Sequence, residues 1–173
     1  MIETNLIITL GAIVILLFLS AFFSGTETAL TGSSRPLMHR LEQIGNQRAK
    51  LVNGLHKKKG QLIGAILIGN NLVNILASAL ATSLLITAFG EAGIAYATII
   101  MTILVVIFAE ILPKTYALQN NDRFALRVAP FIRPIVFIFS PFTSATSFIT
   151  RITFMVFGVK LDRKDGFISR TEE

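Results

Sequence analysis

Residues 6–23 read LIITLGAIVILLFLSAFF, an almost uninterrupted apolar run that ends at Ser24-Gly25. About 20 apolar residues in an α-helix cross the hydrocarbon core of a bilayer, so this run is long enough to span a membrane. A secretory signal peptide would begin with basic residues, whereas the only charge before the run is Glu3. We therefore expect residues 6–27 to form a first transmembrane helix that is retained, with a kink or unwound turn at the Ser/Gly pair.

Two further stretches, residues 61–88 and 92–112, have the same apolar character and are joined by a turn at Gly90-Glu91. The whole composition agrees with this pattern, since 53% of the 173 residues are hydrophobic and only 15% are charged. Such a composition excludes an ordinary soluble globule. The sequence predicts an all-α membrane protein with three transmembrane helices, forming one membrane domain over residues 1–160.

The orientation in the membrane follows from the distribution of Lys and Arg. Residues 31–60 are strongly basic, with Glu42 as the single acidic residue, and apolar side chains recur at helical spacing on either side of Gly45-Asn46. We expect two short amphipathic helices on the cytoplasmic face, because basic loops stay inside. The N-terminus is then outside the plasma membrane and the C-terminus cytoplasmic. The same rule accounts for the +6 net charge without a nucleic-acid partner.

Residues 131–157, within a predicted belt of residues 124–157, are apolar enough to suggest a fourth crossing, but two features argue against one. Pro134 and Pro141 would interrupt such a helix, and a crossing would place the basic residues after 160 outside. We expect a proline-kinked belt helix that lies in the inner leaflet. Residues 161–173 are polar and are predicted to form a cytoplasmic tail leading toward a regulatory domain that this sequence does not contain.

Each predicted span carries polar residues at positions where hydrocarbon disfavours them. An ionisable side chain inside a bilayer costs about 2.5 kcal/mol or more, so it usually faces a protein-lined cavity with a ligand. The helical rise places these groups in the inner half of the bilayer, in a cavity open to the cytoplasm. The primary candidates are Ser24, Asn70, Asn74 and Glu110. The secondary candidates are Ser20, Gly25, Glu27, Asn71, Ala109, Pro113 and Lys114.

Spacing refines the roles of the amides. Asn70 and Asn74 are four residues apart and share one helix face, which favours joint ligation. Asn71 is turned by about 100° and is expected to bond a neighbouring helix. For any single Asn, interhelical hydrogen bonding without a ligand is an equally good interpretation.

The sequence allows two interpretations of the role of Glu110. The ring of Pro113 blocks the hydrogen bond to the Ala109 carbonyl, which leaves an oxygen-rich helix end beside the carboxylate. The alternative is an ion pair between Glu110 and Lys114 at the end of the helix. Glu27 is nearer the water and is expected at the mouth of the cavity.

Carboxylate, amide and hydroxyl oxygens are ligands for Mg²⁺, Ca²⁺ or Na⁺. The chain has no Cys, and its two His residues, His39 and His56, lie in the basic loop, so soft-metal chemistry is effectively excluded. Six oxygens suit Mg²⁺ well, although oxygen ligands alone do not identify the ion.

Three phrases, FSGTETAL at 23–30, IGNNLVNI at 68–75 and AEILPK at 109–114, together resemble the transmembrane domain of the CNNM/CorC family. The resemblance implies Mg²⁺ efflux driven by Na⁺ influx, a homodimer, and a cytosolic CBS-type nucleotide-binding domain farther along the full-length protein. It also implies a magnesium site at the four primary candidates. The small residues Ala77, Ser78, Ala81 and Thr82 are compatible with dimer packing and equally with packing inside one protomer.

Two other functions remain open at this point. The protein is alternatively a Na⁺ or H⁺ carrier that uses Glu110 as its titrating group, or a membrane anchor or sensor that holds a cytosolic domain and transports nothing. The buried polar residues favour transport over an anchor. An enzyme is not expected, because no nucleophile and base are paired in the sequence.

Overall fold

The computed structural model describes the backbone of residues 2–156 and the side chains of residues 6–143 and 145. Every regular element in this range is a helix, which confirms the prediction of an all-α membrane protein. The helices are α1 (Ile2–Gly32), α2 (Arg35–Gln43), α3 (Gln47–Lys57), α4 (Lys59–Phe89), α5 (Ala92–Leu104), the π-helix η1 (Val105–Ile111), α6 (Leu112–Gln119) and α7 (Asn121–Val156).

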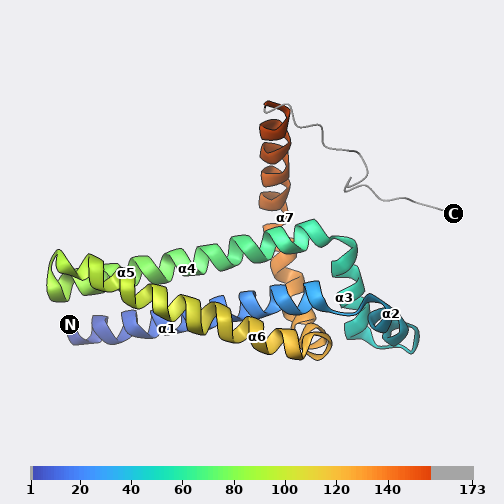
Figure 1. Cartoon of the computed structure of the whole chain (residues 1–173), viewed down its shortest axis with the longest axis horizontal. Helices are drawn as coiled ribbons and strands as arrows, with labels where there is room; N and C mark the ends of the chain where they lie inside the picture. The colour runs from blue at the N-terminus through green and yellow to red at the C-terminus, as the bar shows by residue number, and fades with distance from the viewer. Residues whose placement is uncertain (1, 157–173) are drawn as a thin grey trace.

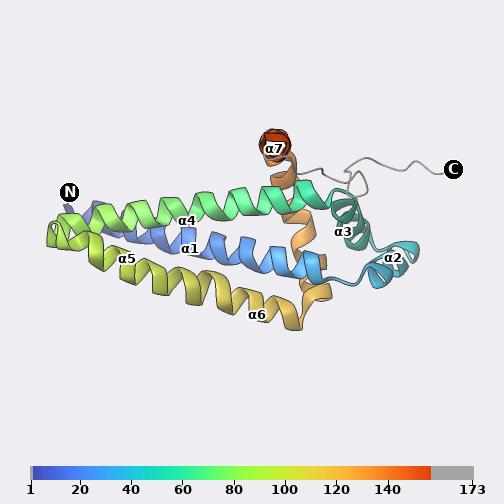
Figure 2. The ribbon, with the colours of Figure 1, turned by 45° about the horizontal axis from the view of Figure 1, so that its top comes forward.

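Three long helical segments lie side by side along the molecule: α1, α4, and the continuous series α5, η1 and α6 (Figure 1). The start of α1 and the turn between α4 and α5 are at one end, and the short helices α2 and α3 are at the other. Helix α7 runs across the three segments near that second end (Figures 1 and 2). The three predicted spans correspond to these three segments, and each segment is longer than predicted.

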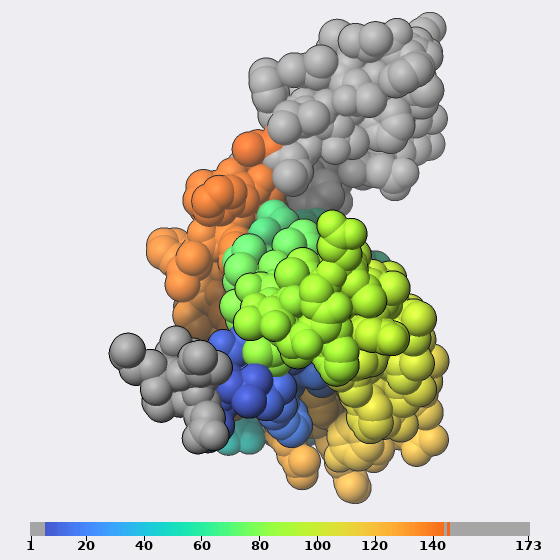
Figure 3. All heavy atoms as spheres, turned by 90° about the vertical axis from the view of Figure 1, so that its left-hand side faces the viewer, coloured from blue at the N-terminus to red at the C-terminus, as the bar shows by residue number. Residues whose placement is uncertain are grey.

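Viewed from the end where α1 begins, α4 and α5 pack beside α1, and α7 extends past the bundle on one side (Figure 3). In this half, a small core forms around Ile13, Ala77, Ala81 and Met101. The two alanines therefore pack within one protomer, which is the second of the interpretations open from sequence. Many large apolar side chains remain exposed on all the long helices, as expected of a surface in contact with lipid.

The expected kink at Ser24-Gly25 is wrong, because α1 is a continuous α-helix to Gly32. Gly25 instead permits a close approach between elements. A Cβ at this position would lie 3.3 Å from the ring of Phe124 on α7 and 3.5 Å from Pro113 on α6. The glycine is therefore a packing residue, and sequence alone could not distinguish this role from flexibility.

The third helix does not end before Pro113 as predicted; it continues to Gln119 through a π-helical segment. The backbone N–H of Leu112 donates to the carbonyl of Ile107, five residues earlier. Proline has no N–H and its ring clashes with the carbonyl four residues back in an α-helix. A π-helical turn changes that register, so Pro113 becomes the start of α6 and not a helix stop.

The two short helices predicted in the basic loop are present, and capping explains where they begin. The Ser34 side chain accepts from the N–H of Leu37 at the start of α2, and the Asn46 side chain accepts from Arg48 and Ala49 at the start of α3. Gly45 between them has φ +90°, a conformation that favours glycine.

Helix α3 is also attached to the end of α1. The Nε2 atom of His56 lies 2.8 Å from the carbonyl oxygen of Leu30 and 3.1 Å from the hydroxyl of Ser33. The basic loop is thereby fixed against the bundle.

Helix α7 corresponds to the predicted belt, and it contains Pro130, Pro134 and Pro141 without a break in the helix. One face, which includes Ala125, Ala129 and Ile132, is fully buried against other elements. By length and composition alone, its segment Asn121–Thr143 is also long and apolar enough to cross a membrane, as are Leu6–Gly32, Lys59–Phe89 and Ala92–Gln119. Its course across the other helices is the arrangement expected of a belt, and its location in the inner leaflet stays a prediction.

Cysteine labelling tests the predicted orientation. Lys58 and Glu91 are both exposed and lie at opposite ends of α4. A Cys at residue 58 is expected to react with an impermeant maleimide only from the cytoplasmic side, and a Cys at residue 91 only from outside. The parent chain has no Cys and serves as the blank. The reverse pattern would invert the topology. The matching prediction for Lys164 falls outside the described residues.

Candidate functional site

The candidate oxygen ligands lie on three helices, of which α1 packs against the other two. Ser20 and Ser24 lie on α1, Asn70 and Asn74 on α4, and Glu110 on η1. Helix α1 packs against both α4 and η1. The tertiary arrangement therefore brings the helices that carry the candidates together at α1.

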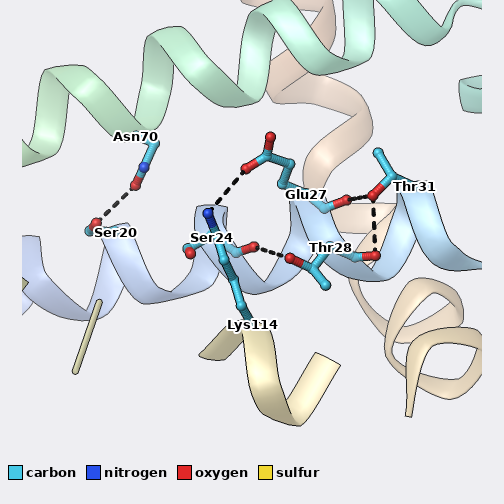
Figure 4. A network of polar contacts seen from close by, with 7 residues as sticks. All are labelled: Ser20, Ser24, Glu27, Thr28, Thr31, Asn70 and Lys114. Atoms are coloured by element: carbon cyan, nitrogen blue, oxygen red, sulfur yellow. Dashed lines mark hydrogen bonds and ion pairs between the residues drawn. The ribbon is translucent and has the colours of Figure 1, made fainter. Parts of the chain in front are cut away.

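One direct contact joins two of these helices. The hydroxyl of Ser20, which is fully buried, donates to the side-chain oxygen of Asn70 at 2.8 Å (Figure 4). An amide oxygen has two lone pairs, so this bond leaves Asn70 one position for another partner. Ser20, a secondary candidate from sequence, is thus a positioning residue for Asn70.

Two other candidates have buried oxygens without partners. The Ser24 hydroxyl and the Asn74 side-chain oxygen are both buried and make no hydrogen bond with any residue whose side chain the structure describes. Leaving such an atom unsatisfied costs about 1–3 kcal/mol, and most buried polar atoms in proteins avoid it. A bound cation would accept both oxygens as ligands.

Thr26, which was not among the predicted candidates, also has a buried hydroxyl without a hydrogen-bond partner among the described residues. It lies two residues after Ser24, which places it about 200° around α1, on the opposite face. Its hydroxyl therefore does not belong with that of Ser24.

Glu110 is half-buried and makes no ion pair or hydrogen bond with any described residue. The alternative pair with Lys114 does not form. The Nζ atom of Lys114 instead lies 4.0 Å from Oε2 of Glu27 on α1 (Figure 4). Glu27 is thus partly neutralised, whereas the carboxylate of Glu110 is left for another cation. Its place on a π-helix is typical of functional positions.

Asn74 opens into a groove of about 500 Å³ between α4, α5 and η1. Hydroxyl side chains line its walls: Ser78, Thr82, Thr98 and Thr102. Val105 also lines the groove, and Glu110 follows it by five residues, the repeat of π-helical hydrogen bonding. Glu110 itself does not line the groove.

Ser78 and Thr82, which were predicted to be small packing residues, instead line this groove. The available signal was their spacing, since Asn74, Ser78 and Thr82 recur every four residues along one helix face. Thr98 and Thr102 on α5 have the same four-residue spacing, and their pairing with the α4 hydroxyls follows from the turn that joins the two helices.

The remaining candidates differ in their contacts. Asn71 is exposed and has no hydrogen-bond partner among the described residues, so the expected bond to a neighbouring helix is wrong within this chain. Gly25, Ala109 and Pro113 offer no side-chain oxygen. Gly25 and Pro113 are close neighbours in the packing, and Ala109 is fully buried.

The donor set consists of hydroxyls, amide oxygens and one unpaired carboxylate. Among the residues that the structure describes, no three His, Cys, Asp or Glu side chains form a metal-binding group. The hydroxyl, amide and carboxylate oxygens of the candidate site suit a hard cation that keeps part of its water shell. Among the candidate oxygens of the described residues, one hydrogen bond is present, from Ser20 to Asn70, and a single coordination sphere formed by Ser24, Asn70, Asn74 and Glu110 stays a prediction.

Comparison with known proteins gives a consistent relationship. The family described as CNNM, cyclin M transmembrane N-terminal domain, matches residues 11–172. The UPF0053 inner membrane protein YfjD of Escherichia coli is 40% identical over 144 residues, which are 83% of this chain and 34% of YfjD. A UPF0053 protein of Haemophilus influenzae is 36% identical over 160 residues, 92% of this chain and 38% of that protein.

A third relative has a name that states an activity. The polyamine export protein of Haemophilus influenzae is 28% identical over 174 residues, which cover 93% of this chain and 40% of that protein. The chain thus spans little more than a third of the length of these relatives.

Proposed function

This chain belongs to the CNNM family, and on that premise we propose that it transports Mg²⁺ across the membrane through a cavity that contains Ser24, Asn70, Asn74 and Glu110. The observation that carries the proposal is the set of unsatisfied oxygens within apolar helices. The Ser24 and Asn74 oxygens are buried without partners, and the nearby η1 segment holds an unpaired carboxylate. A membrane anchor would have no use for such groups.

The ligand chemistry supports Mg²⁺ over a transition metal. Mg²⁺ prefers oxygen ligands in octahedral geometry and gives up its water reluctantly, so a few protein oxygens with retained waters suffice. One carboxylate supplies partial charge compensation for the divalent ion. Weak, incomplete compensation is appropriate for a transported ion, which must also leave the site.

The direction of transport and its coupling are proposed from the family resemblance. We expect Mg²⁺ efflux coupled to Na⁺ influx, from a cavity that opens toward the cytoplasm in this conformation. The same resemblance supports a homodimer with one ion site in each protomer and a CBS-type nucleotide-binding domain in the full-length protein.

A polyamine is the second candidate substrate, because one relative is named a polyamine export protein. A linear polyamine is also cationic and would need acceptor oxygens along its length. The hydroxyl-lined groove that begins at Asn74 offers such oxygens. The two substrates differ in an observable way, since only a polyamine needs the whole groove.

Reconstituted flux distinguishes the candidates. Proteoliposomes containing the full chain are expected to move Mg²⁺, reported by an indicator dye, while spermidine neither moves nor competes. Selective spermidine transport would replace Mg²⁺ as the substrate. Selective Na⁺ or H⁺ flux without Mg²⁺ would establish the carrier alternative, and the absence of any selective flux, together with no Mg²⁺ binding by calorimetry, would support an anchor.

Three single variants of α4 test the role of the amides. Asn70→Ala and Asn74→Ala are each expected to lower Mg²⁺ flux by about tenfold, equivalent to about 1.4 kcal/mol per lost ligand. Asn71→Ala is the matched control, because Asn71 is exposed and points away from the face that residues 70 and 74 share. If Asn71→Ala gave the largest loss, the cavity would lie on another face of α4.

A further inference from the structure

A second depression lies away from the cation site, at the end of the molecule that holds the short helices. It has a volume of about 640 Å³ and lies where α3, the first turn of α4 and the middle of α7 meet. Figure 2 shows α3 and the start of α4 beside the crossing of α7. None of the residues proposed for cation transport lines it.

Charge is the distinguishing property of this depression, which we name the basic groove. Lys50 on α3, Lys58 at the junction of α3 and α4, and Arg133 on α7 line it, and no Asp or Glu does. All three cations are exposed, and none of them forms an ion pair with a described residue. Three like charges brought together from separate elements repel one another unless an anion binds between them.

The rest of the basic groove is suited to an amphiphile. Gln47, Gln61 and Ser140 supply polar groups beside the cations, whereas Leu55 and Val136 form an apolar floor. On α7 the groove continues into Phe137, whose side chain is 80% exposed. Phe131, Ile138 and Phe142 are also at least 60% exposed, but the helical period places them on the face of α7 opposite the groove.

We propose that the basic groove binds the phosphate of an anionic phospholipid from the cytoplasmic leaflet, with an acyl chain lying against the apolar floor and the exposed ring of Phe137. Lys and Arg near a membrane surface attract anionic headgroups, and basic pockets between helices are recognised headgroup sites. Arg133 presents a planar guanidinium that binds phosphate in a bidentate manner, while the two lysines act as point charges. The lipid would thereby join α3 to α7.

The apolar surface beside the cations distinguishes a lipid from a soluble anion as the ligand of the basic groove. Inorganic phosphate would contact the three cations and make no contact with the ring of Phe137, which borders the groove. This exposed ring beside the cations, at the end where the basic loop meets the belt, favours a ligand with both a charged and an apolar part.

Native mass spectrometry of the detergent-solubilised full chain tests the proposal. Phosphatidylglycerol is expected to be retained and phosphatidylcholine not. In the triple variant Lys50→Gln/Lys58→Gln/Arg133→Gln, the affinity for phosphatidylglycerol is expected to fall by about a hundredfold, roughly fivefold for each cation lost. Arg133→Gln alone is expected to give about a fivefold loss and remains informative if the triple variant does not fold.

The matched control changes the same number of charges on the same helices outside the basic groove. Arg48, Lys57 and Arg127 are exposed and do not line it. Arg48→Gln/Lys57→Gln/Arg127→Gln is expected to keep phosphatidylglycerol affinity within about twofold, because these side chains do not line the groove and make no direct contact with a phosphate bound there. An equal loss in both triple variants would overturn the site, since binding would then follow net charge alone.

Two further results would also overturn the proposal. One is equal retention of phosphatidylcholine and phosphatidylglycerol. The other is complete competition by inorganic phosphate at millimolar concentration, which would identify a soluble-anion site. Because these measurements involve no transported ion, their outcome does not depend on whether the protein transports Mg²⁺.

Discussion

Replacing Glu110 with Gln is expected to weaken Mg²⁺ binding by at least tenfold while leaving the helical structure intact. Glu110 is the unpaired carboxylate of the candidate site, and Gln keeps its size and one oxygen but removes the charge. Two unit charges about 4 Å apart interact by about 4 kcal/mol at an effective dielectric constant near 20. Glu110 is half-buried, so solvent screening reduces that value, and a tenfold loss is the lower bound we expect.

Isothermal titration calorimetry of the purified variant measures this loss directly. The matched control is Glu27→Gln, which removes a carboxylate already paired with Lys114 at 4.0 Å and should change Mg²⁺ affinity much less. Far-ultraviolet circular dichroism establishes that both variants remain helical. Unchanged affinity in a folded Glu110→Gln protein would remove Glu110 from the site, and a larger effect at Glu27 would move the site toward the mouth of the cavity.

Gly69→Ala is expected to destabilise the protein by about 1–3 kcal/mol, the usual cost of overpacking. Gly69 lies on α4 next to Asn70, and an added Cβ would be 2.7 Å from the ring of Phe23 on α1. Phe23 is itself in the core, with 6% of its surface exposed, so its ring cannot move aside freely. The two helices must separate, which would also lengthen the bond between Ser20 and Asn70.

Gly11→Ala is the matched control, because it is the same change in a transmembrane helix with no neighbour within 4 Å of the added carbon. Alanine is the better helix former, so this variant should be as stable as the parent or slightly more stable. Thermal unfolding in one detergent compares the two, and Mg²⁺ titration shows whether Gly69→Ala also loses affinity. Equal unfolding midpoints would mean that α1 and α4 are less closely packed at Gly69 than the structure indicates.

The positions of the helices were predictable because hydrophobic length is a local property of the chain. Residues 6–23 and 61–88 are apolar over a length that only a membrane or a large core accommodates, and the sequence contains nothing else that would cover them. The short helices α2 and α3 were predictable for a related reason, since Gly45-Asn46 supplies both a break and an N-cap.

The course of the chain after Glu110 was not predictable in the same way. From sequence, Pro113 predicts the end of a helix, because its ring is incompatible with α-helical hydrogen bonding. In the structure a π-helical segment precedes Pro113 and lets the helix continue. Hydrogen-bond register is a cooperative property of several turns packed against α1, and no single residue encodes it.

For the candidate site, residue type alone predicts the ligand chemistry. Ser24, Asn70, Asn74 and Glu110 stood out because oxygen-bearing side chains in apolar spans are costly, and that cost does not depend on the fold. Residue type therefore indicated a hard cation before any arrangement was known.

Only the tertiary structure decided how those oxygens are partnered. It gave Asn70 a hydrogen bond from Ser20, directed Lys114 to Glu27 and away from Glu110, left Asn71 exposed, and joined Asn74 to the hydroxyl-lined groove. The physical reason is that partnership depends on the relative rotation of packed helices. Close contacts such as Gly69 against Phe23 set that rotation, and they join residues that lie far apart in the sequence.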